Sequence, residues 1–256
     1  MPVTTFIGGR RRDRRGLRCS IRRHGEASRR GKIAPMRILA LETATHRLSI
    51  ALWQDGRVLE RAAELPNGSS EWLLPNVRAL LAESGAGLKM LDGIAFGAGP
   101  GSFTGLRLAA GCAQGLACGL DLPVLGIGTL AALALAAGER KVYACLDARM
   151  NEVYVAAYAD GIEAMAPVVC PPAQAPLPPG GDWIGCGDGF ASYAESLPAF
   201  ARMRADLRPT AEAVARLAAP RFARGEGVSA AGAQPIYVRE KVALTTVERL
   251  ARGGTK

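Results

Sequence analysis

The sequence predicts an α/β fold in which mixed sheets are flanked by helices and the arrangement is duplicated. Three strand-like segments in a row are followed by helix and strand patterns in alternation. This order, β-β-β-α-β-α-β, recurs in outline further along the chain. The composition agrees, because 49% hydrophobic and 21% charged residues in 256 positions are typical of a globular protein with a sizeable core.

The first half opens with a strand meander. Three consecutive segments alternate or concentrate apolar residues as strands do: 37–42, 47–53 and 58–64. Asp55-Gly56 predicts the tight turn of a hairpin. A helix is expected over 69–85, because apolar residues recur there at helical spacing. Ser69 or Ser70 is expected to cap that helix, and Gly85 to end it.

Strand and helix patterns then alternate along the chain. The expected segments are a buried strand over 92–99, a helix over 103–119, a strand over 123–127, a helix over 129–137, a strand over 141–147 and a proline-rich loop over 166–180. Segment 152–160 is interpreted as the returning arm of a second hairpin, 181–189 as a short strand entering a glycine turn, and 210–225 as an amphipathic helix. These elements predict an N-terminal domain over 36–137 and a C-terminal domain over 138–256.

The net charge of +9 is confined to the start of the chain. Residues 1–35 hold eleven basic and two acidic side chains, whereas 36–256 hold equal numbers of each. The first 35 residues lack hydrophobic periodicity, so we interpret them as disordered. They could form a polycationic arm held near RNA or an acidic surface. Alternatively, translation begins at Met36, which the strand directly after that methionine favours.

The remaining composition predicts a cytoplasmic protein without a metal site. No apolar run follows the early arginines as in a secretory signal, and the longest apolar run, 122–138, is too short for a membrane span. Six cysteines are scattered without a CxxC pair and are expected to be reduced and buried. No two His or Cys residues have the spacing of metal ligands. Asp147 and Arg149 could close an active site or form a local salt bridge.

The stretch GPGSFTG, 99–105, lies where a nucleophile elbow or a phosphate loop would lie, between a strand and a helix. Pro100 and Thr104 replace the glycines that flank an elbow serine, so Ser102 is not assigned as a nucleophile. Ser102 and Thr104 are better interpreted as helix caps. His46 is the single histidine after the N-terminal segment, and we assign no catalytic residue. The stretch also matches neither common phosphate-loop motif, so the signal for anion binding is weak.

Four segments resemble one known family. They are MRILALETATHRLSIALW, FGAGPGSFTGLRLAAGCAQGLACGLDLPVLGIGTL, LDARMNEVYVAAY and QPIYVREKVAL. Together they resemble the bacterial TsaB proteins, also called YeaZ, from Met36 to about Thr246. The resemblance implies the actin-like, ribonuclease-H-like duplicated fold. It also implies a subunit of the machinery that makes N6-threonylcarbamoyladenosine (t6A) at position 37 of tRNAs reading codons that begin with A. In that machinery the transfer belongs to the paralogue TsaD, TsaE is an ATPase partner, and TsaC-type enzymes supply threonylcarbamoyl-AMP.

The resemblance further implies a degenerate nucleotide site. Actin-like ATPases carry Asp-x-Gly-x-Thr after the first strand, where this chain has Glu42-Thr43-Ala44-Thr45. Glycine turns near the former nucleotide site are expected at Gly99, Gly101, Ser102, Gly187, Asp188 and Gly189. The two metal-binding histidines of TsaD have no counterpart. The chain is therefore expected to be non-catalytic and to bind no cofactor alone, with ATP and metal belonging to partner subunits.

A partner surface is the last expectation. Gly111, Gly115 and Gly119 recur every four residues, and interior glycines cost a helix about 1 kcal/mol each relative to alanine. A bare helix face that another helix approaches explains that cost, although the row could also face the protein's own sheet. In the family this face docks on TsaD or on a second copy, with tRNA contacted through the complex. The expected contact residues are Leu73, Leu74, Val77, Leu81, Arg107, Gly111, Gly115 and Gly119.

An autonomous ATP-dependent phosphotransferase of the same superfold is the alternative function. A protease is disfavoured because no catalytic group is evident.

Overall fold

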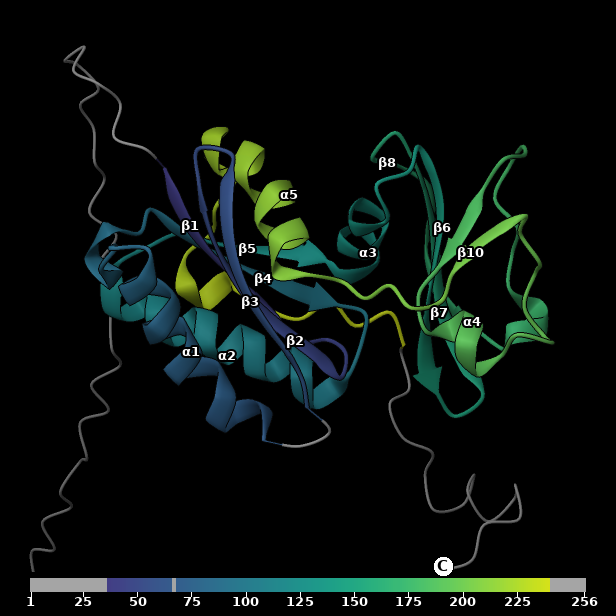
Figure 1. The fold of residues 1–256 in the computed structure, drawn as a ribbon, viewed down its shortest axis with the longest axis horizontal. Helices are drawn as coiled ribbons and strands as arrows, with labels where there is room; N and C mark the ends of the chain where they lie inside the picture. The colour runs from purple at the N-terminus through teal and green to yellow at the C-terminus, as the bar shows by residue number, and fades with distance from the viewer. Residues whose placement is uncertain (1–35, 66–67, 240–256) are drawn as a thin grey trace, which may run out of the picture. The chain divides into compact units, whose positions relative to one another are not determined.

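A computed structural model describes residues 36–65 and 68–239, all within a compact unit that spans Ala34–Lys256 (Figure 1). Both interpretations of residues 1–35 concern a segment outside the described residues and stay predictions. Within the described ranges no helix is long and apolar enough to span a membrane.

In the described part of the chain, ten strands form two five-stranded sheets. The first contains β1 (Arg37–Glu42), β2 (Arg47–Gln54), β3 (Arg57–Glu64), β4 (Gly93–Gly99) and β5 (Val124–Gly128), in the order β3-β2-β1-β4-β5. The second contains β6 (Lys141–Arg149), β7 (Glu152–Ala159), β8 (Ile162–Cys170), β9 (Ile184–Cys186) and β10 (Arg202–Arg204), in the order β10-β9-β6-β7-β8. In each sheet the central strand pairs antiparallel with its hairpin partner and parallel with the fourth strand. The predicted duplication of a mixed sheet is confirmed.

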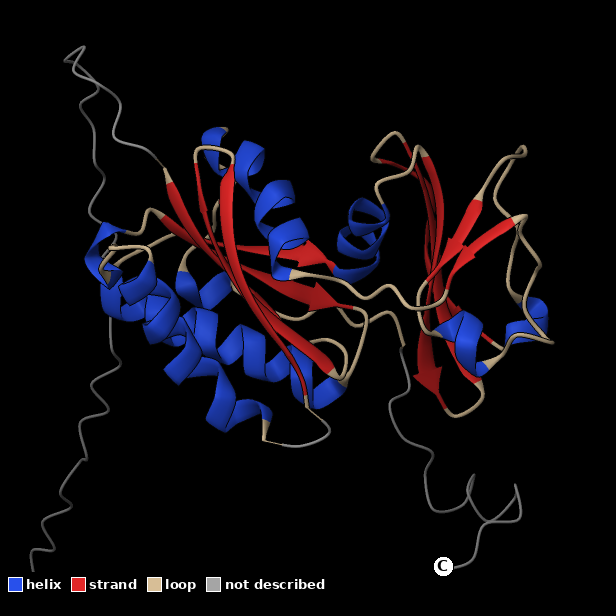
Figure 2. Cartoon of the chain, viewed as in Figure 1, coloured by secondary structure: helices blue, strands red, loops and turns tan. Residues whose placement is uncertain are grey.

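Helices cover both faces of the first sheet (Figure 2). They are α1 (Ser69–Glu83), α2 (Phe103–Leu120), α3 (Thr129–Ala137) and α5 (Ala211–Ala223), whereas α4 (Gly189–Ser192) packs on β6 of the second sheet. Short 3-10 turns lie at Leu88–Met90, Pro172–Gln174 and Ala230–Gly232. Leu39 and Leu41 of β1 join the core under α1 and α2, whereas Ile38 and Ala40 join the core under α5. Because both faces of β1 are covered, its sequence is almost continuously apolar.

Helix α3 belongs to the cores of both sheets. Leu130 and Leu133 pack with β6 and β7 of the second sheet, while Ala132 packs with the first. A helix with two buried faces is apolar nearly all round, as the run TLAALALAA is. The ends of β1 and β6 are thereby held in one compact unit.

Several sequence expectations differ from the structure. Gly68, with a positive φ of 83°, precedes α1, and neither Ser69 nor Ser70 caps it. Strands β8 and β10 were not expected, and β8 takes up the start of the predicted proline-rich loop. Cys118 is exposed rather than buried. The helix α5 packs on β1 and β2 although it lies in the predicted C-terminal domain, and the domain boundaries stay a prediction.

Candidate functional site

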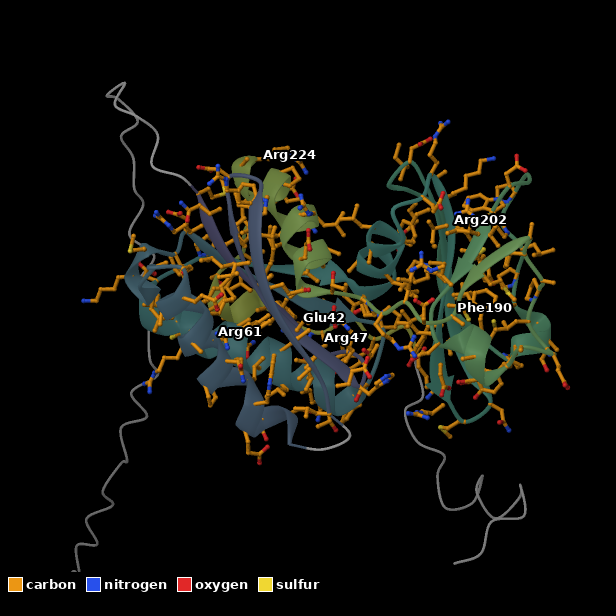
Figure 3. The ribbon with its side chains drawn as sticks, viewed as in Figure 1. Glu42, Arg47, Arg61, Phe190, Arg202 and Arg224 are labelled. Atoms are coloured by element: carbon orange, nitrogen blue, oxygen red, sulfur yellow. The ribbon has the colours of Figure 1, made fainter. Side chains whose placement is uncertain are left out.

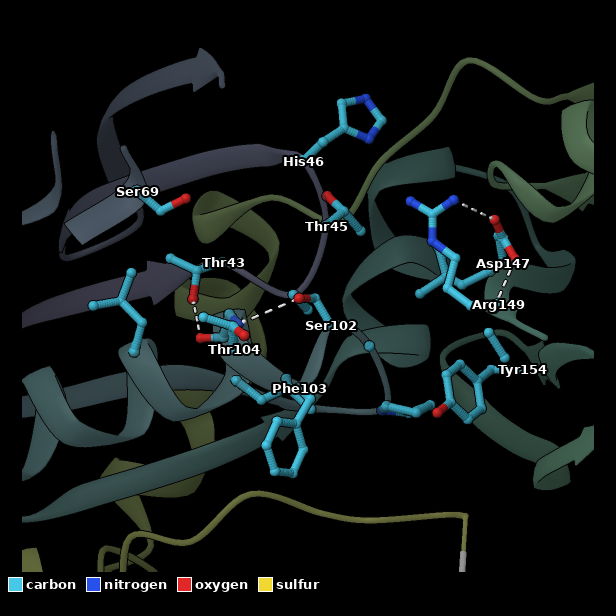
Figure 4. A pocket seen from close by; sticks show the side chains of 18 of the residues that line it. Thr43, Thr45, His46, Ser69, Ser102, Phe103, Thr104, Asp147, Arg149 and Tyr154 are labelled. Atoms are coloured by element: carbon cyan, nitrogen blue, oxygen red, sulfur yellow. Dashed lines mark hydrogen bonds and ion pairs between the residues drawn. The ribbon is translucent and has the colours of Figure 1, made fainter. Parts of the chain in front are cut away.

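A cavity of about 730 Å³ lies where the ends of β1 and β6 meet (Figure 4). Its walls are the turn after β1, the first turns of α1 and α2, the end of β6, Asp188, and an extended segment near the C-terminus. Five of the predicted nucleotide-site residues line it: Thr43, Thr45, Gly101, Ser102 and Asp188. The structure therefore brings residues from both halves of the chain to one site.

Glu42, labelled in Figure 3, is the last residue of β1 and directly precedes Thr43 in the cavity wall. Its side chain is completely buried. Its Oε1 accepts a hydrogen bond of 2.7 Å from the backbone N–H of Ala44. Its Oε2 has no hydrogen-bond partner within the described residues, and it lies where a side chain on Gly97 would overlap it. Burial raises the pKa of Glu42 to about 7, and the N–H groups of Ala44 and Thr43 limit that rise by stabilising the charged form.

The first turn of α2 is packed directly against the turn after β1. The Ser102 N–H donates to the carbonyl of Ala44 at 2.8 Å, and the Thr43 hydroxyl donates to the carbonyl of Gly105 at 2.7 Å. A Cβ on Gly101 would lie 2.7 Å from Ala44, and one on Gly105 would overlap the Thr43 carbonyl. Ser102 caps α2 as expected, since its hydroxyl accepts from the Gly105 N–H at 3.4 Å.

The end of β6 carries the other charged wall. Asp147 accepts a hydrogen bond of 2.7 Å from the Arg149 N–H and pairs with the Arg149 guanidinium at 3.1 Å. The Tyr193 hydroxyl donates to the same carboxylate, and the Asp147 N–H donates to Asp188 at 3.0 Å. The local salt bridge left open above is thus present.

The extended segment 233–239, which we call the strap, joins the two halves. Ile236 donates its N–H to the carbonyl of Ala98 at 2.7 Å, beside the first sheet. Arg239 pairs with Glu152 and donates to the carbonyl of Ala148 at 3.1 Å, at the end of the second sheet. The strap therefore forms one wall of the cavity and ties both sheets together.

The remaining predicted glycines, Gly99, Gly187 and Gly189, do not line the cavity. A Cβ on Gly99 would lie 2.6 Å from the carbonyl oxygen of Ile236. A Cβ on Gly187 or Gly189 would overlap atoms of Cys145. Gly99 and Gly187 also have positive φ values of 121° and 108°, which favour glycine. Across residues 36–65 and 68–239 no three His, Cys, Asp or Glu side chains are grouped as metal ligands.

The predicted partner face is partly corrected by the structure. Leu73, Val77 and Leu81 are 0%, 3% and 4% exposed and pack in the chain's own core, so their assignment as contact residues is wrong. Leu74 is half exposed beside a second cavity of about 680 Å³, which Leu88 and Leu116 also line.

On α2, a Cβ at Gly111, Gly115 or Gly119 would have no neighbour within 4 Å. The alternative that this row faces the protein's own sheet is therefore wrong. Arg107 lies on the same exposed row, where its guanidinium is 3.7 Å from the centre of the Phe103 ring.

Comparisons with known proteins decide the family. The TsaB protein "tRNA threonylcarbamoyladenosine biosynthesis protein TsaB" of Escherichia coli K12 is 37% identical over 225 residues, 81% of this chain and 96% of the relative. The chain belongs to the TsaB family. The Haemophilus influenzae TsaB protein is 36% identical over 80% of this chain and 94% of its own length.

Solved structures and a family match agree with TsaB membership. The structure titled "YeaZ from Pseudomonas aeruginosa" has 42% identity and a TM-score of 0.75, covering 79% of this chain and 99% of that one. Residues 64–181 match the family described as "TsaD: tRNA N6-adenosine threonylcarbamoyltransferase". The expected actin-like fold, with two mixed sheets flanked by helices, is confirmed.

The sequence did not predict the strap, and it left two roles open for Asp147 and Arg149 of the β6 turn. Tyr237 and Arg239 lie in QPIYVREKVAL, and Asp147 and Arg149 in LDARMNEVYVAAY, two segments that carried the TsaB resemblance. The similarity marked these segments. Hydrophobic patterning predicts the strand at 152–160, but it does not place either segment beside the cavity.

Proposed function

We propose that this chain is the TsaB subunit of the machinery that forms t6A at position 37 of tRNAs reading codons that begin with A. The observation that carries the proposal is the similarity to the E. coli TsaB protein over 96% of that protein's length. The chain acts by binding and supporting TsaD together with TsaE, and it contributes no catalytic residue of its own. ATP and metal belong to the partner subunits.

The exposed row on α2 is the proposed TsaD-binding face. It begins with Arg107 and continues with Gly111, Gly115 and Gly119, each on the next helical turn. Outside the backbone of α2 itself, a Cβ at these three glycines would meet no atom of the described chain within 4 Å, so a partner helix can approach the backbone of α2 directly. Leu74 and the apolar cavity beside it extend the face onto α1. Without TsaD, the same face can pair with a second copy.

Contact with tRNA is proposed to be indirect. Ten arginines in the described ranges form ion pairs with carboxylates, so their charge is largely balanced. A surface that binds nucleic acid by itself presents unbalanced cationic charge to the phosphates. This balance favours a subunit that holds the tRNA-binding protein rather than the tRNA.

The alternative of an autonomous phosphotransferase has no support from the site. The N–H groups of Ala44 and Ser102 and the hydroxyl of Thr43 already have acceptors within the chain. These are the groups that would have to face a phosphate at the turn after β1.

The proposal is tested in cells depleted of their own TsaB and supplied with this chain. Mass spectrometry of total tRNA should show t6A restored by the wild-type chain. Gly115→Leu should fail to restore it and should lose co-purification with TsaD, while keeping or raising the melting temperature of the isolated protein. Gly181→Leu, at another glycine with open space, is the matched control. Restoration of t6A by Gly115→Leu together with TsaD binding would refute the assigned face, and no t6A with the wild-type chain would refute the function.

A further inference from the structure

We propose that Arg107 is the charged anchor of the partner face on α2, and that Phe103 and Tyr237 position its guanidinium to receive a carboxylate of TsaD. This anchor depends on the proposed TsaD-binding face, and it adds the chemistry that the partner must present there. It also gives the strap, which is far from α2 in the sequence, a role in binding.

Arg107 is the single charged residue of α2, a helix of 18 residues. It lies in the second turn, near the end of the helix where the unpaired backbone N–H groups and the helix dipole favour negative charge. Arg107 is not one of the ten arginines that form ion pairs with carboxylates in the described ranges. A cation at this place therefore calls for a carboxylate from outside the described chain.

Two aromatic side chains fix the direction of the guanidinium. Helical side chains lean back toward the N-terminus, and Arg107 lies over the ring of Phe103, one turn earlier, with its guanidinium carbon 3.7 Å from the ring centre. The Nε of Arg107 donates a hydrogen bond of 3.3 Å to the hydroxyl of Tyr237. The two ring centres are 6.1 Å apart. A side chain that is flexible elsewhere is thus held on two sides.

Tyr237 is in turn held by the strap, which is bonded to the first half on both sides of α2. The Gln114 side-chain amide donates to the carbonyl of Ala233 at 2.7 Å, from the middle of α2. The Ile236 N–H, directly before Tyr237, donates to the carbonyl of Ala98 at 2.7 Å. The hydroxyl that accepts from Arg107 therefore has a fixed position relative to the helix.

These contacts leave one edge of the guanidinium free. Because Nε is bonded to Tyr237 and one face lies on Phe103, the two terminal Nη nitrogens are the donors without an acceptor among the described residues. That pair of donors matches the two oxygens of one carboxylate, the geometry of the strongest arginine ion pairs. Phe103, labelled in Figure 4, lines the cavity together with Tyr237, whereas Arg107 does not. The free edge therefore serves a group on the exposed face of α2 rather than a ligand in the cavity.

The surroundings of Arg107 resemble the centre of a binding surface. Phe103 and Tyr237 are 42% and 50% exposed, so a partner that covers the cluster also removes aromatic surface from water. Arginine and tyrosine are enriched among residues that dominate binding, and a side chain that is already held in place loses less freedom on association. The occupant that fits is a TsaD helix with an Asp or Glu opposite Arg107. A second copy that packed its own α2 here would bring no carboxylate, because α2 has none.

The experiment measures the dissociation constant of the complex with TsaD by isothermal titration calorimetry, at low and at high salt. Arg107→Ala should weaken binding by about 10- to 100-fold at low salt, and its binding should depend less on salt than that of wild type. Arg107→Lys should recover only part of this loss, because an ammonium keeps the charge without the paired donors. Arg57→Ala is the matched control, since Arg57 is also exposed and outside the ten ion pairs but lies at the start of β3.

A double-mutant cycle tests the positioning role of Tyr237. Tyr237→Phe keeps the ring but removes the acceptor of the Arg107 Nε, and it should weaken TsaD binding by about 2- to 10-fold. In the Arg107→Ala background the same change should have no effect. An equal effect in both backgrounds would show that Tyr237 contacts TsaD directly and would overturn its positioning role.

The remaining outcomes separate the anchor from the proposed function. TsaD binding by Arg107→Ala as tight as by Arg57→Ala would overturn the anchor and leave the proposed function intact. A wild-type chain that does not bind TsaD would refute both. If Arg107→Ala lost self-association but kept TsaD binding, the carboxylate would belong to a second copy, and its assignment to TsaD would be wrong.

Discussion

Replacing Glu42 by glutamine should remove a pH-dependent loss of stability. The carboxyl has a pKa of about 7 in the folded protein, against 4.5 as its ordinary value, because it is buried. A raised carboxyl pKa means that the folded state holds the proton more tightly than the unfolded state. The stability that protonated Glu42 contributes is therefore fully present below about pH 4.5 and is lost as the pH rises through about 7.

The size of this stability loss follows from the shift in the pKa of Glu42. A difference of about 2.5 pKa units corresponds to about 3 kcal/mol of unfolding free energy. Glutamine keeps the shape and an acceptor for the Ala44 N–H but does not ionise. The variant should match wild type within about 1 kcal/mol at pH 5 and exceed it by about 3 kcal/mol at pH 8. For a domain of this size that difference is about 6–12 °C in the melting temperature.

The assay is urea unfolding followed by circular dichroism at half-unit steps from pH 5 to pH 8.5. Subtracting the unfolding free energy of wild type from that of Glu42→Gln cancels the contributions of all other titrating groups. Glu83→Gln, an exposed carboxylate ion-paired with Arg61 at 2.8 Å, controls for the change in net charge. A difference that stays constant over this range would show that Glu42 does not titrate as reasoned, and the burial argument would be wrong.

Three further predictions concern the N-terminal segment, catalysis and the strap. A chain that starts at Met36 should restore t6A as well as the full chain does, and a salt-dependent loss of tRNA binding on truncation would instead assign the basic arm a role. The purified protein should hydrolyse ATP no faster than buffer, and turnover that disappears in Glu42→Ala would revive the phosphotransferase alternative. Arg239→Ala should lower the unfolding free energy by about 1–3 kcal/mol, because the Ala148 carbonyl and Glu152 lose a charged donor. Hydrogen exchange at the β6–β7 turn should be faster in Arg239→Ala than in Arg239→Lys, and this comparison checks the prediction.

Most of the fold could be predicted from the sequence because the central strands and helices have strong hydrophobic patterns. The run 37–42 is apolar on both faces, since α1 and α2 lie on one side of β1 and α5 on the other. The helix 103–119 has a buried alanine stripe and was placed within one residue of its observed end. Local pattern is sufficient where one face of an element is fully buried.

The elements that were missed have weak local patterns. Strand β10 has three exposed residues, Arg202–Arg204, and β8 lies at a sheet edge with its first half exposed. The strap at 233–239 is held by hydrogen bonds and an ion pair to residues far away in the sequence, and no period in the sequence predicts such contacts. The spacing of Leu73, Val77 and Leu81 correctly marked a buried face of α1, but periodicity does not say whether a core or a partner covers it.

Glycine occurs in this chain for two opposite physical reasons, and the sequence alone does not distinguish them. At Gly101 and Gly105 the backbone of another segment is so close that a side chain would collide with it. At Gly111, Gly115 and Gly119 nothing in the described chain occupies the space, yet each glycine weakens α2 by about 1 kcal/mol. A cost with no compensating contact inside the monomer points to a contact outside it. The glycine row on α2 therefore supports the proposed docking of TsaD more directly than the apolar face of α1 does.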